Sequence, residues 1–411
     1  MALIVQKFGG TSVHTPDRIR SVAARVARVK QAGNDVVVVV SAMGHTTDEL
    51  VALANQVVPN ARRDHPREMD MLLTAGERIA MALLAMAIRQ LGFEALSLTG
   101  SQAAIITDEM HTGARIQEVR ATRVREELER GRIVIVAGFQ GVSRTREVTT
   151  LGRGGSDTTA VALAAALGAD RCDIYTDVDG VYTSDPRRVR DARLLSRIDY
   201  EEMVELATSG AQVMHPRAVE IGARFGVPIR VLSSFRDGDN GGTLITHRDS
   251  SMEGLTLTGL ASEGGYARLA LRGLPADMNT TTRVLKRLAD EKISVDMLAQ
   301  VDREDGRRQL QITVAEDGLD HIREICQDLI RELGGESLDV RTGLTRVALV
   351  GSGMVNLPGV YARTYNALTQ AGIDVYAVSS SSISISLLVD SANEDRSLQI
   401  LHSAFDLGEA H

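Results

Sequence analysis

Residues 3–40 read LIVQKFGGTSVHTPDRIRSVAARVARVKQAGNDVVVVV, and this stretch decides the fold class. An apolar run at residues 3–7 ends in a Gly-Gly turn, and residues 36–40 are an unbroken β-branched run of the kind that lies buried in a parallel sheet. Between these runs, Thr15 suits the N-cap of a helix, Pro16 its first turn and Gly33 its end. Two parallel strands joined by a helix make a βαβ unit, so we expect an α/β fold.

Further strand and helix signals continue to residue 232. The sequence predicts strands at residues 95–98, 133–137, 172–176 and 227–232, and helices at residues 69–90, 116–130 and 156–168. This alternation favours a mostly parallel sheet sandwiched by helices. From Ser233 to Gly254 the chain turns polar and glycine-rich, which indicates a connector, and we place a domain boundary near Ser250.

The chain after residue 250 repeats one order of elements. With 411 residues, the chain exceeds the roughly 250 to 300 residues at which single cores stop growing. Residues 251–342 show the order strand, helix, strand, strand, helix, strand, and residues 343–411 begin the same order again. We therefore expect a catalytic domain at residues 1–250, followed by two ferredoxin-like βαββαβ modules.

The net charge of −8 opposes binding to nucleic acid, which relies on clustered basic side chains. The content of 44% hydrophobic and 24% charged residues is that of a globular protein. The two cysteines, Cys172 and Cys326, lie in apolar patterns without metal-ligand spacing, so we expect buried thiols and no metal held by the protein alone. Because the start shows no basic segment followed by a long apolar one, we expect a cytoplasmic protein with no membrane partner.

Two glycine-rich motifs point to a site for anions. KFGGTS, residues 7–12, follows the first predicted strand, where glycines allow backbone N–H groups to approach phosphate oxygens and Lys7 offers a positive charge. TTLGRGGSDTTA, residues 149–160, leads into a predicted helix whose N-terminus attracts anions, and Arg153 can grip a carboxylate. The alternatives are a tight turn with a solvated lysine and an ordinary loop with Ser156 or Asp157 as N-cap.

A third motif, YTDVDGVYTSDPR at residues 175–187, begins at the end of a predicted strand, where open α/β sheets bind ligands. Tyr182 is suited to flank an adenine ring and Arg187 to reach a phosphate. The alternative is a pair of turns, at residues 179–180 and 185–186, that bind no ligand.

A fourth group combines SAMGHTTDEL, residues 41–50, with MDMLLTAGERIA, residues 69–80. It places hydroxyl groups after a strand and the carboxylate of Glu77 in an otherwise apolar helix. The alternative is that Glu77 forms a solvated pair with Arg78. His215, in VMHPRAV, is interpreted as structural.

Taken together, these segments resemble the aspartokinase family of the amino-acid kinase fold, in the short form with two C-terminal ACT modules. KFGGTS, SAM with TTDEL, LLTAGER, VAGFQGV, TTLGRGGSDTTA and YTDVDGVYTSDPR occur in the family's order and spacing, and the likeness covers nearly the whole chain. The resemblance implies an ATP-dependent aspartate kinase that makes 4-phospho-L-aspartate for lysine, threonine and methionine biosynthesis. Mg²⁺ would arrive with ATP.

The resemblance also implies roles for single residues. The catalytic residues would be Lys7, Arg153 and Asp157. The ATP site would be formed by Lys7, Gly9, Gly10, Thr11, Thr176, Asp177, Tyr182, Arg187 and Gln212. The aspartate site would be formed by Ser41, Thr47, Glu77, Arg153 and Ser156. Lys7 would neutralise the moving phosphoryl group, with Asp157 orienting it. Glu77 would pair with the substrate ammonium. Phosphoryl transfer needs positioning and charge stabilisation, and a carboxylate nucleophile needs no general base at neutral pH.

The chain departs from the family pattern at three places. Gln212, in GAQVMHP, stands where relatives usually carry a lysine that touches phosphate, and losing that contact would weaken nucleotide binding by about 1.5 to 3 kcal/mol unless a cation such as Arg217 replaces it. In the first module, PADMNTTTRV lacks a Pro-Gly turn and Gln300 precedes Val301. In the second, Ser382 stands where relatives show an acidic residue. We therefore expect weakened feedback inhibition by lysine or threonine.

Two other functions stay open, and one assembly is expected. The chain could be a kinase of the same fold for glutamate, acetylglutamate or a nucleotide, or a catalytically weak amino-acid sensor. Small βαβ modules expose an edge strand and an apolar sheet face that pairing can bury, so we expect a homo-oligomer through the ACT modules.

Overall fold

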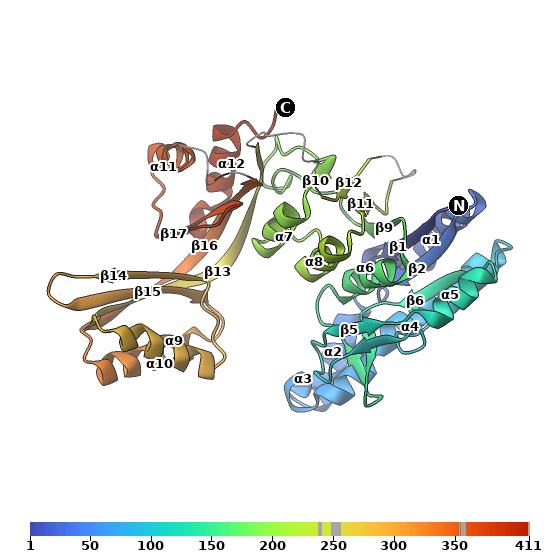
Figure 1. The fold of residues 1–411 in the computed structure, drawn as a ribbon, viewed down its shortest axis with the longest axis horizontal. Helices are drawn as coiled ribbons and strands as arrows, with labels where there is room; N and C mark the ends of the chain where they lie inside the picture. The colour runs from blue at the N-terminus through green and yellow to red at the C-terminus, as the bar shows by residue number, and fades with distance from the viewer. Residues whose placement is uncertain (237–240, 248–255, 353, 355–358, 410–411) are drawn as a thin grey trace. The chain divides into compact units, whose positions relative to one another are not determined.

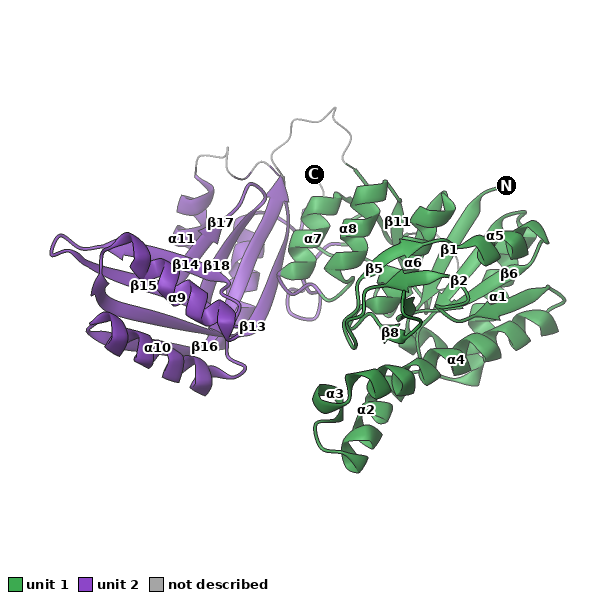
Figure 2. Cartoon of the chain, turned by 60° about the horizontal axis from the view of Figure 1, so that its bottom comes forward, with its two compact units in different colours: residues 1–182, 194–208, 212–253 green, residues 183–193, 209–211, 254–411 purple. Residues whose placement is uncertain are grey.

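The computed structural model describes residues 1–236, 241–247, 256–352, 354 and 359–409 (Figure 1). The chain divides into two compact units, coloured separately in Figure 2. The first unit comprises Met1–Tyr182, Leu194–Thr208 and Gln212–Glu253, and the second Thr183–Arg193, Ser209–Ala211 and Gly254–His411. The chain therefore leaves the first unit twice before it enters the second for good.

The first unit is built on an eight-stranded sheet of order β10-β12-β11-β9-β1-β2-β6-β3. Its strands are β1 (Leu3–Phe8), β2 (Asp35–Val40), β3 (Ala95–Leu98), β6 (Ile133–Ala137), β9 (Arg171–Thr176), β10 (Arg197–Ile198), β11 (Ile229–Ser233) and β12 (Thr243–Ile245). All neighbours pair in parallel except β11 and β12. The expected mostly parallel α/β sheet is confirmed.

Helices of the first unit lie on both sides of this sheet. They are α1 (Pro16–Gln31), α2 (Thr46–Val57), α3 (Ala61–Asp64), α4 (Pro66–Gln90), α5 (Thr122–Glu129), α6 (Gly155–Leu167), α7 (Tyr200–Thr208) and α8 (Pro216–Phe225), with the short 3₁₀ helix η1 at Gly10–Val13. Thr15 is confirmed as the N-cap of α1, since its hydroxyl accepts from Arg18 N at 3.3 Å. Gly168 ends α6 in a left-handed conformation, which a residue without Cβ adopts at little cost.

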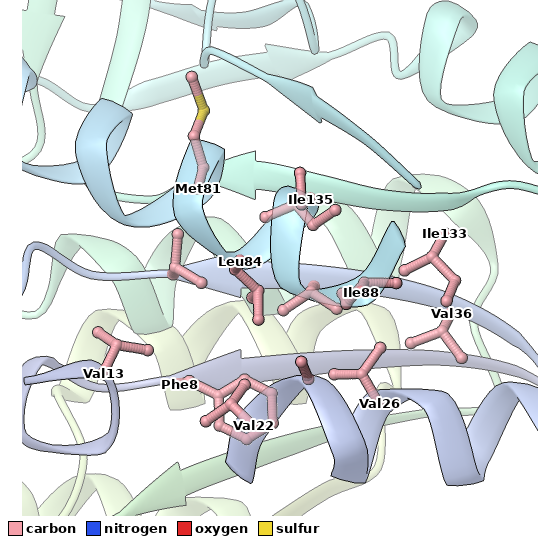
Figure 3. Close-up of a cluster of buried hydrophobic side chains, with 14 of the residues drawn as sticks. Phe8, Val13, Val22, Val26, Val36, Met81, Leu84, Ile88, Ile133 and Ile135 are labelled. Atoms are coloured by element: carbon pink, nitrogen blue, oxygen red, sulfur yellow. The ribbon is translucent and has the colours of Figure 1, made fainter. Parts of the chain in front are cut away.

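One hydrophobic core explains why α1 and α4 cover the same face of the sheet. Val22 and Val26 of α1 and Leu84 and Ile88 of α4 meet the even-numbered side chains of the first two strands, such as Val36 (Figure 3). Side chains alternate across a strand, so the odd-numbered residues of β1 face the other side. Helix α6 contacts β1 without contributing to this core, and it therefore covers that opposite face.

Two sequence predictions in the first unit are wrong. Residues 116–130 are not one helix, because Ile116–Val119 form strand β5 and α5 begins only at Thr122, after Ala121 adopts a left-handed conformation with φ 50°. The stretch from Ser233 to Gly254 is not only a connector, since β12 pairs with β11. The sequence also failed to predict a small sheet of order β5-β4-β7-β8, which includes β4 (Ile105–Thr107), β7 (Gln140–Ser143) and β8 (Val148–Thr150). Strands of three or four residues carry little periodic signal.

The second unit holds a six-stranded antiparallel sheet of order β14-β15-β13-β16-β18-β17. Its elements are β13 (Thr256–Pro275), α9 (Met278–Asp290), β14 (Met297–Asp302), β15 (Arg307–Ala315), α10 (Leu319–Leu333), β16 (Ser337–Ser352), α11 (Val360–Gln370), β17 (Ala377–Ser380), β18 (Ser384–Asp390), the 3₁₀ helix η3 (Ser391–Asn393) and α12 (Glu394–Ala404). The long strands β13 and β16 pair with each other at the centre of this sheet, and β13 also pairs with β15 and β16 with β18. The division into modules at residues 251–342 and 343–411 stays a prediction.

Helix α4 is long and apolar enough to cross a membrane by length and composition alone. Half of its most apolar window is buried in the fold, and it carries the buried carboxylates Asp70 and Glu77. These features are typical of a core helix in a folded domain. Among the described residues, no other helix passes the same test.

Candidate active site

The carboxyl ends of four parallel strands meet at one edge of the main sheet. The strand register aligns Phe8 with Val40 and Tyr175, and Val40 with Ala137. Backbone hydrogen bonds then join the residues that follow: Gly9 N donates to Tyr175 O at 3.3 Å, Ser41 N to Phe8 O at 3.1 Å, and Gly138 N to Val40 O at 3.0 Å. Three of the four predicted motifs therefore begin at this edge, which is where open α/β sheets bind ligands.

Lys7 and Asp157 form an ion pair at this edge. Lys7 Nζ lies 2.6 Å from Asp157 Oδ1, and each side chain is little more than a tenth exposed. Lys7 projects from the face of β1 that α6 covers, and Asp157 lies in the first turn of α6. The pairing of strand and helix thus brings together the two residues that the sequence placed 150 positions apart.

The Gly-rich motif forms the entry to α6 and leaves its N-terminus without a side-chain cap. Gly154, the N-cap residue, has φ +65°, and a Cβ there would lie 2.2 Å from His215 Cβ. Ser156 and Asp157 are buried in the first turn, and the neighbouring Arg153 is exposed. His215 itself caps α8 by accepting from Arg217 N at 3.3 Å, and burial lowers the pKa of its imidazole. The structural interpretation of His215 is confirmed.

Glu77 is buried in the middle of α4 and reaches the loop after β2. Its Oε1 accepts from Ala42 N at 3.2 Å, while its Oε2 has no hydrogen-bond partner within the described part of the chain. Burial raises the pKa of this carboxyl from 4.5 to about 7, against the opposing effect of the backbone hydrogen bonds. The alternative interpretation, in which Glu77 forms a solvated pair with Arg78, is therefore wrong.

The loops that carry Ser41, Thr47 and Gly10 are joined to one another. Gly44 N donates to Gly10 O at 3.0 Å, and a Cβ on Gly10 would lie only 3.0 Å from Ala42 O. Ser41 and Thr47 are half-buried, the latter in the first turn of α2. Backbone contact of this kind requires a residue without a side chain, which explains the second glycine of KFGGTS.

The third motif splits between the two units. Thr176 and Asp177 belong to the first, where Thr176 Oγ1 donates to Asp177 Oδ1 at 3.1 Å, and Tyr182 donates to Asp179 Oδ2 at 3.4 Å. Burial raises the pKa of the Tyr182 phenol. Arg187 falls in the second unit, where its guanidinium holds Asp185 at 2.8 Å. Its role beside a nucleotide stays a prediction.

Gln212, Gln300 and Ser382, the three single residues singled out as departures from the family pattern, are exposed. Gln212 lies in the first unit and Ser382 in the turn between β17 and β18, while Gln300 accepts from Thr281 Oγ1 at 2.8 Å. Arg217 donates to Leu151 O at 2.8 Å and to Ala114 O at 3.0 Å. This arginine therefore supports the Gly-rich loop, which opposes its proposed role as a substitute cation for Gln212.

Sequence reasoning missed a buried polar cluster beneath the Gly-rich loop. Asp70 of α4 is fully buried and binds His111, Thr112 and Thr150. A carboxylate seven residues before Glu77 in the same apolar helix was the available signal, since residues seven apart share a helix face.

An apolar pocket of about 430 Å³ lies elsewhere, between α2, α3 and α4. Its lining includes Leu53, Val57, Met69 and Leu72, and no residue of the predicted site contributes to it. Its ionisable lining residues are His65 and Glu68, and the other lining residues are apolar. We therefore do not assign the chemistry to this pocket.

Known proteins match the chain over its whole length. The amino acid kinase family matches residues 2–233 and the ACT domain residues 347–405. An aspartokinase from Geobacillus stearothermophilus is 47% identical over 411 residues, covering 100% of this chain and 98% of that protein. The chain belongs to the aspartokinase family. An aspartokinase from Mycolicibacterium smegmatis is 48% identical over 413 residues, covering 99% of this chain and 97% of that one.

Solved aspartokinase structures share the fold. Escherichia coli aspartokinase III in complex with aspartate and ADP, in its R-state, matches with a TM-score of 0.81 at 28% identity, covering 98% of this chain and 100% of that chain. The same enzyme in complex with lysine and aspartate, in its T-state, matches with a TM-score of 0.74 at 28% identity, covering 98% of this chain and 99% of that chain. The expected fold, with an amino-acid kinase part followed by an ACT region, is confirmed.

Proposed function

We propose that this chain transfers the γ-phosphoryl group of MgATP to the side-chain carboxylate of L-aspartate, which gives 4-phospho-L-aspartate. The observation that carries the proposal is Glu77 Oε2, a buried oxygen without a hydrogen-bond partner among the described residues. A buried anion that lacks a partner is costly, so this oxygen is suited to a cation that arrives with the substrate. The ammonium group of an amino acid is such a cation.

The opposite end of the substrate would meet the Gly-rich loop. Arg153 is exposed there and can hold the α-carboxylate of aspartate through two parallel hydrogen bonds. The uncapped N-terminus of α6 adds a favourable field for negative charge. Ser41, Thr47 and Ser156 would complete the aspartate site.

The phosphoryl group would be stabilised by Lys7, which Asp157 holds in place. Charge stabilisation by a fixed cation in a partly buried site is the main contribution a protein makes to phosphoryl transfer. Gly9, Gly10 and Thr11 would line the phosphates, and the residues of the third motif would hold the nucleotide. Among the described residues, no group of three or more His, Cys, Asp or Glu could hold a metal, so Mg²⁺ would be bound mainly through the phosphates of ATP.

The relatives support both substrates and an effector. E. coli aspartokinase III has been crystallised with aspartate and ADP, and also with lysine and aspartate. We carry the same ligands over to this chain as proposals, together with a homo-oligomer through the ACT region and a cytoplasmic location. Weaker nucleotide binding through Gln212 belongs to the same proposal.

Hydroxylamine trapping of the acyl phosphate tests the reaction. The protein with MgATP and L-aspartate should form aspartyl hydroxamate, while glutamate, acetylglutamate and nucleotides should neither replace nor compete with aspartate. Hydroxamate formed faster from another acceptor would move the chain to a different kinase of this fold. Tight aspartate binding without hydroxamate would instead favour an amino-acid sensor.

A further inference from the structure

Asp70 is a fully buried carboxylate that collects donors from the end of β8 and from the loop between β4 and β5. Thr150 Oγ1 donates to its Oδ1 at 2.5 Å, and Thr112 N donates to the same oxygen at 3.0 Å. His111 Nδ1 lies 2.7 Å from its Oδ2. The carboxylate is therefore satisfied by the protein and, unlike Glu77, leaves no oxygen for a ligand.

The two segments held by Asp70, the end of β8 and the loop between β4 and β5, lie against the Arg153 loop. Thr150 is the last residue of β8 and stands three residues before Arg153. Thr112 lies beneath the same loop, since a Cβ on Gly152 would be 3.3 Å from Thr112 O. Ala114 N also donates to Thr150 O at 2.8 Å, which ties the two segments to each other.

The backbone at Thr112 shows that this arrangement is imposed. Its φ is +62°, a left-handed conformation that a β-branched residue rarely adopts. Such strain persists only where the surroundings fix the conformation, and the hydrogen bond from Thr112 N to Asp70 supplies that restraint. A purely stabilising core would be served as well by apolar side chains of similar volume.

Asp70 and Glu77 share one face of α4, two helical turns or about 10 Å apart. Glu77 binds the loop after β2 through Ala42 N, and Asp70 binds the start of the Arg153 loop. We propose that Asp70 is a positioning residue that fixes, through Thr150 and Thr112, where Arg153 meets the substrate carboxylate. The ammonium partner and the carboxylate partner of aspartate are then both held relative to a single rigid helix. This inference rests on the proposed function.

Thr150→Val tests the inference, with Thr149→Val as its matched control. Both threonines are fully buried in β8, but Thr149 Oγ1 bonds Thr107 Oγ1 at 2.7 Å and has no bond to Asp70. Thr150→Val removes the charge-assisted hydrogen bond to Asp70. We expect this loss to raise the KM for aspartate about tenfold and to change the KM for ATP by less than about twofold. Thr149→Val should lower Tm comparably and leave the KM for aspartate near that of the wild type.

A double-mutant cycle with Arg153→Ala separates positioning from general loosening. If Thr150 acts through Arg153, Thr150→Val should add almost nothing once Arg153 is alanine. Equal effects of Thr150→Val and Thr149→Val on the KM for aspartate, or additive effects in the cycle, would overturn the inference.

The proposed function has its own, separate outcome. If the wild type forms no hydroxamate, the proposed function fails, and aspartate affinities of the same variants, measured by calorimetry, still decide whether Asp70 positions Arg153. If the wild type is active and the variants behave alike, only the positioning role is lost.

Discussion

Glu77 is a buried carboxylate whose charged form the free protein does not favour. Its carboxylate is buried, one oxygen lacks a hydrogen-bond partner among the described residues, and burial raises its pKa to about 7. An amino-acid ammonium at this position would favour the ionised form. The free protein carries this group at a cost that substrate would relieve.

We expect Glu77→Gln to stabilise the free protein at alkaline pH. Because the folded pKa lies above the unfolded value of 4.5, the folded state binds more protons between about pH 4.5 and 7. The stability that protonated Glu77 contributes is full below that window and lost as the pH rises through about 7. We compare the free energy of unfolding of the variant with that of the wild type at two pH values. The difference should be more favourable to the variant at about pH 8.5 than at about pH 5, by on the order of 1 to 3 kcal/mol.

Denaturant titrations at both pH values measure this change, with the exposed Glu126→Gln as control. The control should show no such pH-dependent difference. Aspartate affinity of the Glu77 variant should fall sharply at every pH. A variant whose stability follows the wild type at both pH values would show that Glu77 does not titrate in this window.

Lys7 lends itself to a kinetic test, because its charge acts on the moving phosphoryl group. We expect Lys7→Ala to lower kcat by about two orders of magnitude or more, with little change in aspartate affinity, since the contact strengthens in the transition state. Lys30→Ala is the control. Lys30 Nζ lies 2.9 Å from Asp35 Oδ1, and Asp35 is at the start of β2, at the opposite end of that strand from the predicted site. A near-normal kcat for the Lys7 variant would remove its assignment.

At the scale of elements, α6 offers two glycines with the same backbone and different surroundings. Gly154 and Gly168 both have φ +65°, but a Cβ on Gly154 would meet His215 at 2.2 Å, whereas no atom of the described residues lies within 4 Å of a Cβ on Gly168. Gly168→Ala should cost only the left-handed strain, about 1 kcal/mol, and leave the kinetics unchanged. Gly154→Ala should cost more and raise the KM for aspartate, because the Arg153 loop must shift.

Thermal unfolding and steady-state kinetics of both variants check this expectation. Equal losses of stability would mean that His215 moves aside without displacing the loop. An unchanged KM for aspartate in Gly154→Ala would also separate the loop from substrate binding.

Elements with a strong period could be predicted from the sequence. The Val36–Val40 run and the Thr15 cap gave β2 and α1, and residues 95–98 and 133–137 were placed at their observed bounds. Residues 116–130 were misjudged because apolar positions in a short strand and a short helix can imitate one longer helix. The Lys7–Asp157 pair could be inferred only through the family resemblance. The spacing of Asp70 and Glu77 could have indicated a second carboxylate on the same face of α4, but the partners of Asp70 could not be predicted, because they lie in a three-residue strand and an irregular loop.

At the scale of the whole molecule, β14 and β17 are the end strands of the second unit's sheet, and among the described residues each pairs with only one neighbouring strand. Leu298, Val301 and Val378 on these strands are between four and six tenths exposed. Apolar edges of this kind invite pairing with another chain. We therefore expect at least a homodimer in solution, measurable by light scattering during size-exclusion chromatography.

Charge on an edge strand should weaken that assembly. Val301→Lys should shift the protein toward monomer, whereas Met110→Lys, at an exposed position in the first unit, should not. A wild type that stays monomeric at micromolar concentration would rule out the proposed pairing.

Regulation is the last property that depends on the whole molecule. An effector such as lysine or threonine can inhibit only if it binds one global state more tightly than another. The family resemblance implies an acidic residue where this chain has Ser382, which lies exposed in the β17–β18 turn. Gln300 already accepts a hydrogen bond from Thr281. An effector ammonium without a carboxylate partner loses several kcal/mol when buried, which exceeds a typical coupling of about 1 to 3 kcal/mol.

We therefore expect half-maximal inhibition by lysine or threonine only above about 1 mM, where binding is worth roughly 4 kcal/mol. Ser382→Asp should restore a carboxylate at this turn and lower the inhibitory concentration, while Ser382→Asn, similar in size and uncharged, should not. Inhibition assays on all three proteins, with each amino acid separately and together, give the comparison. Sub-millimolar inhibition of the wild type would mean that another group already binds the effector ammonium. Identical inhibition curves for Ser382→Asp and Ser382→Asn would show that Ser382 does not belong to the effector site.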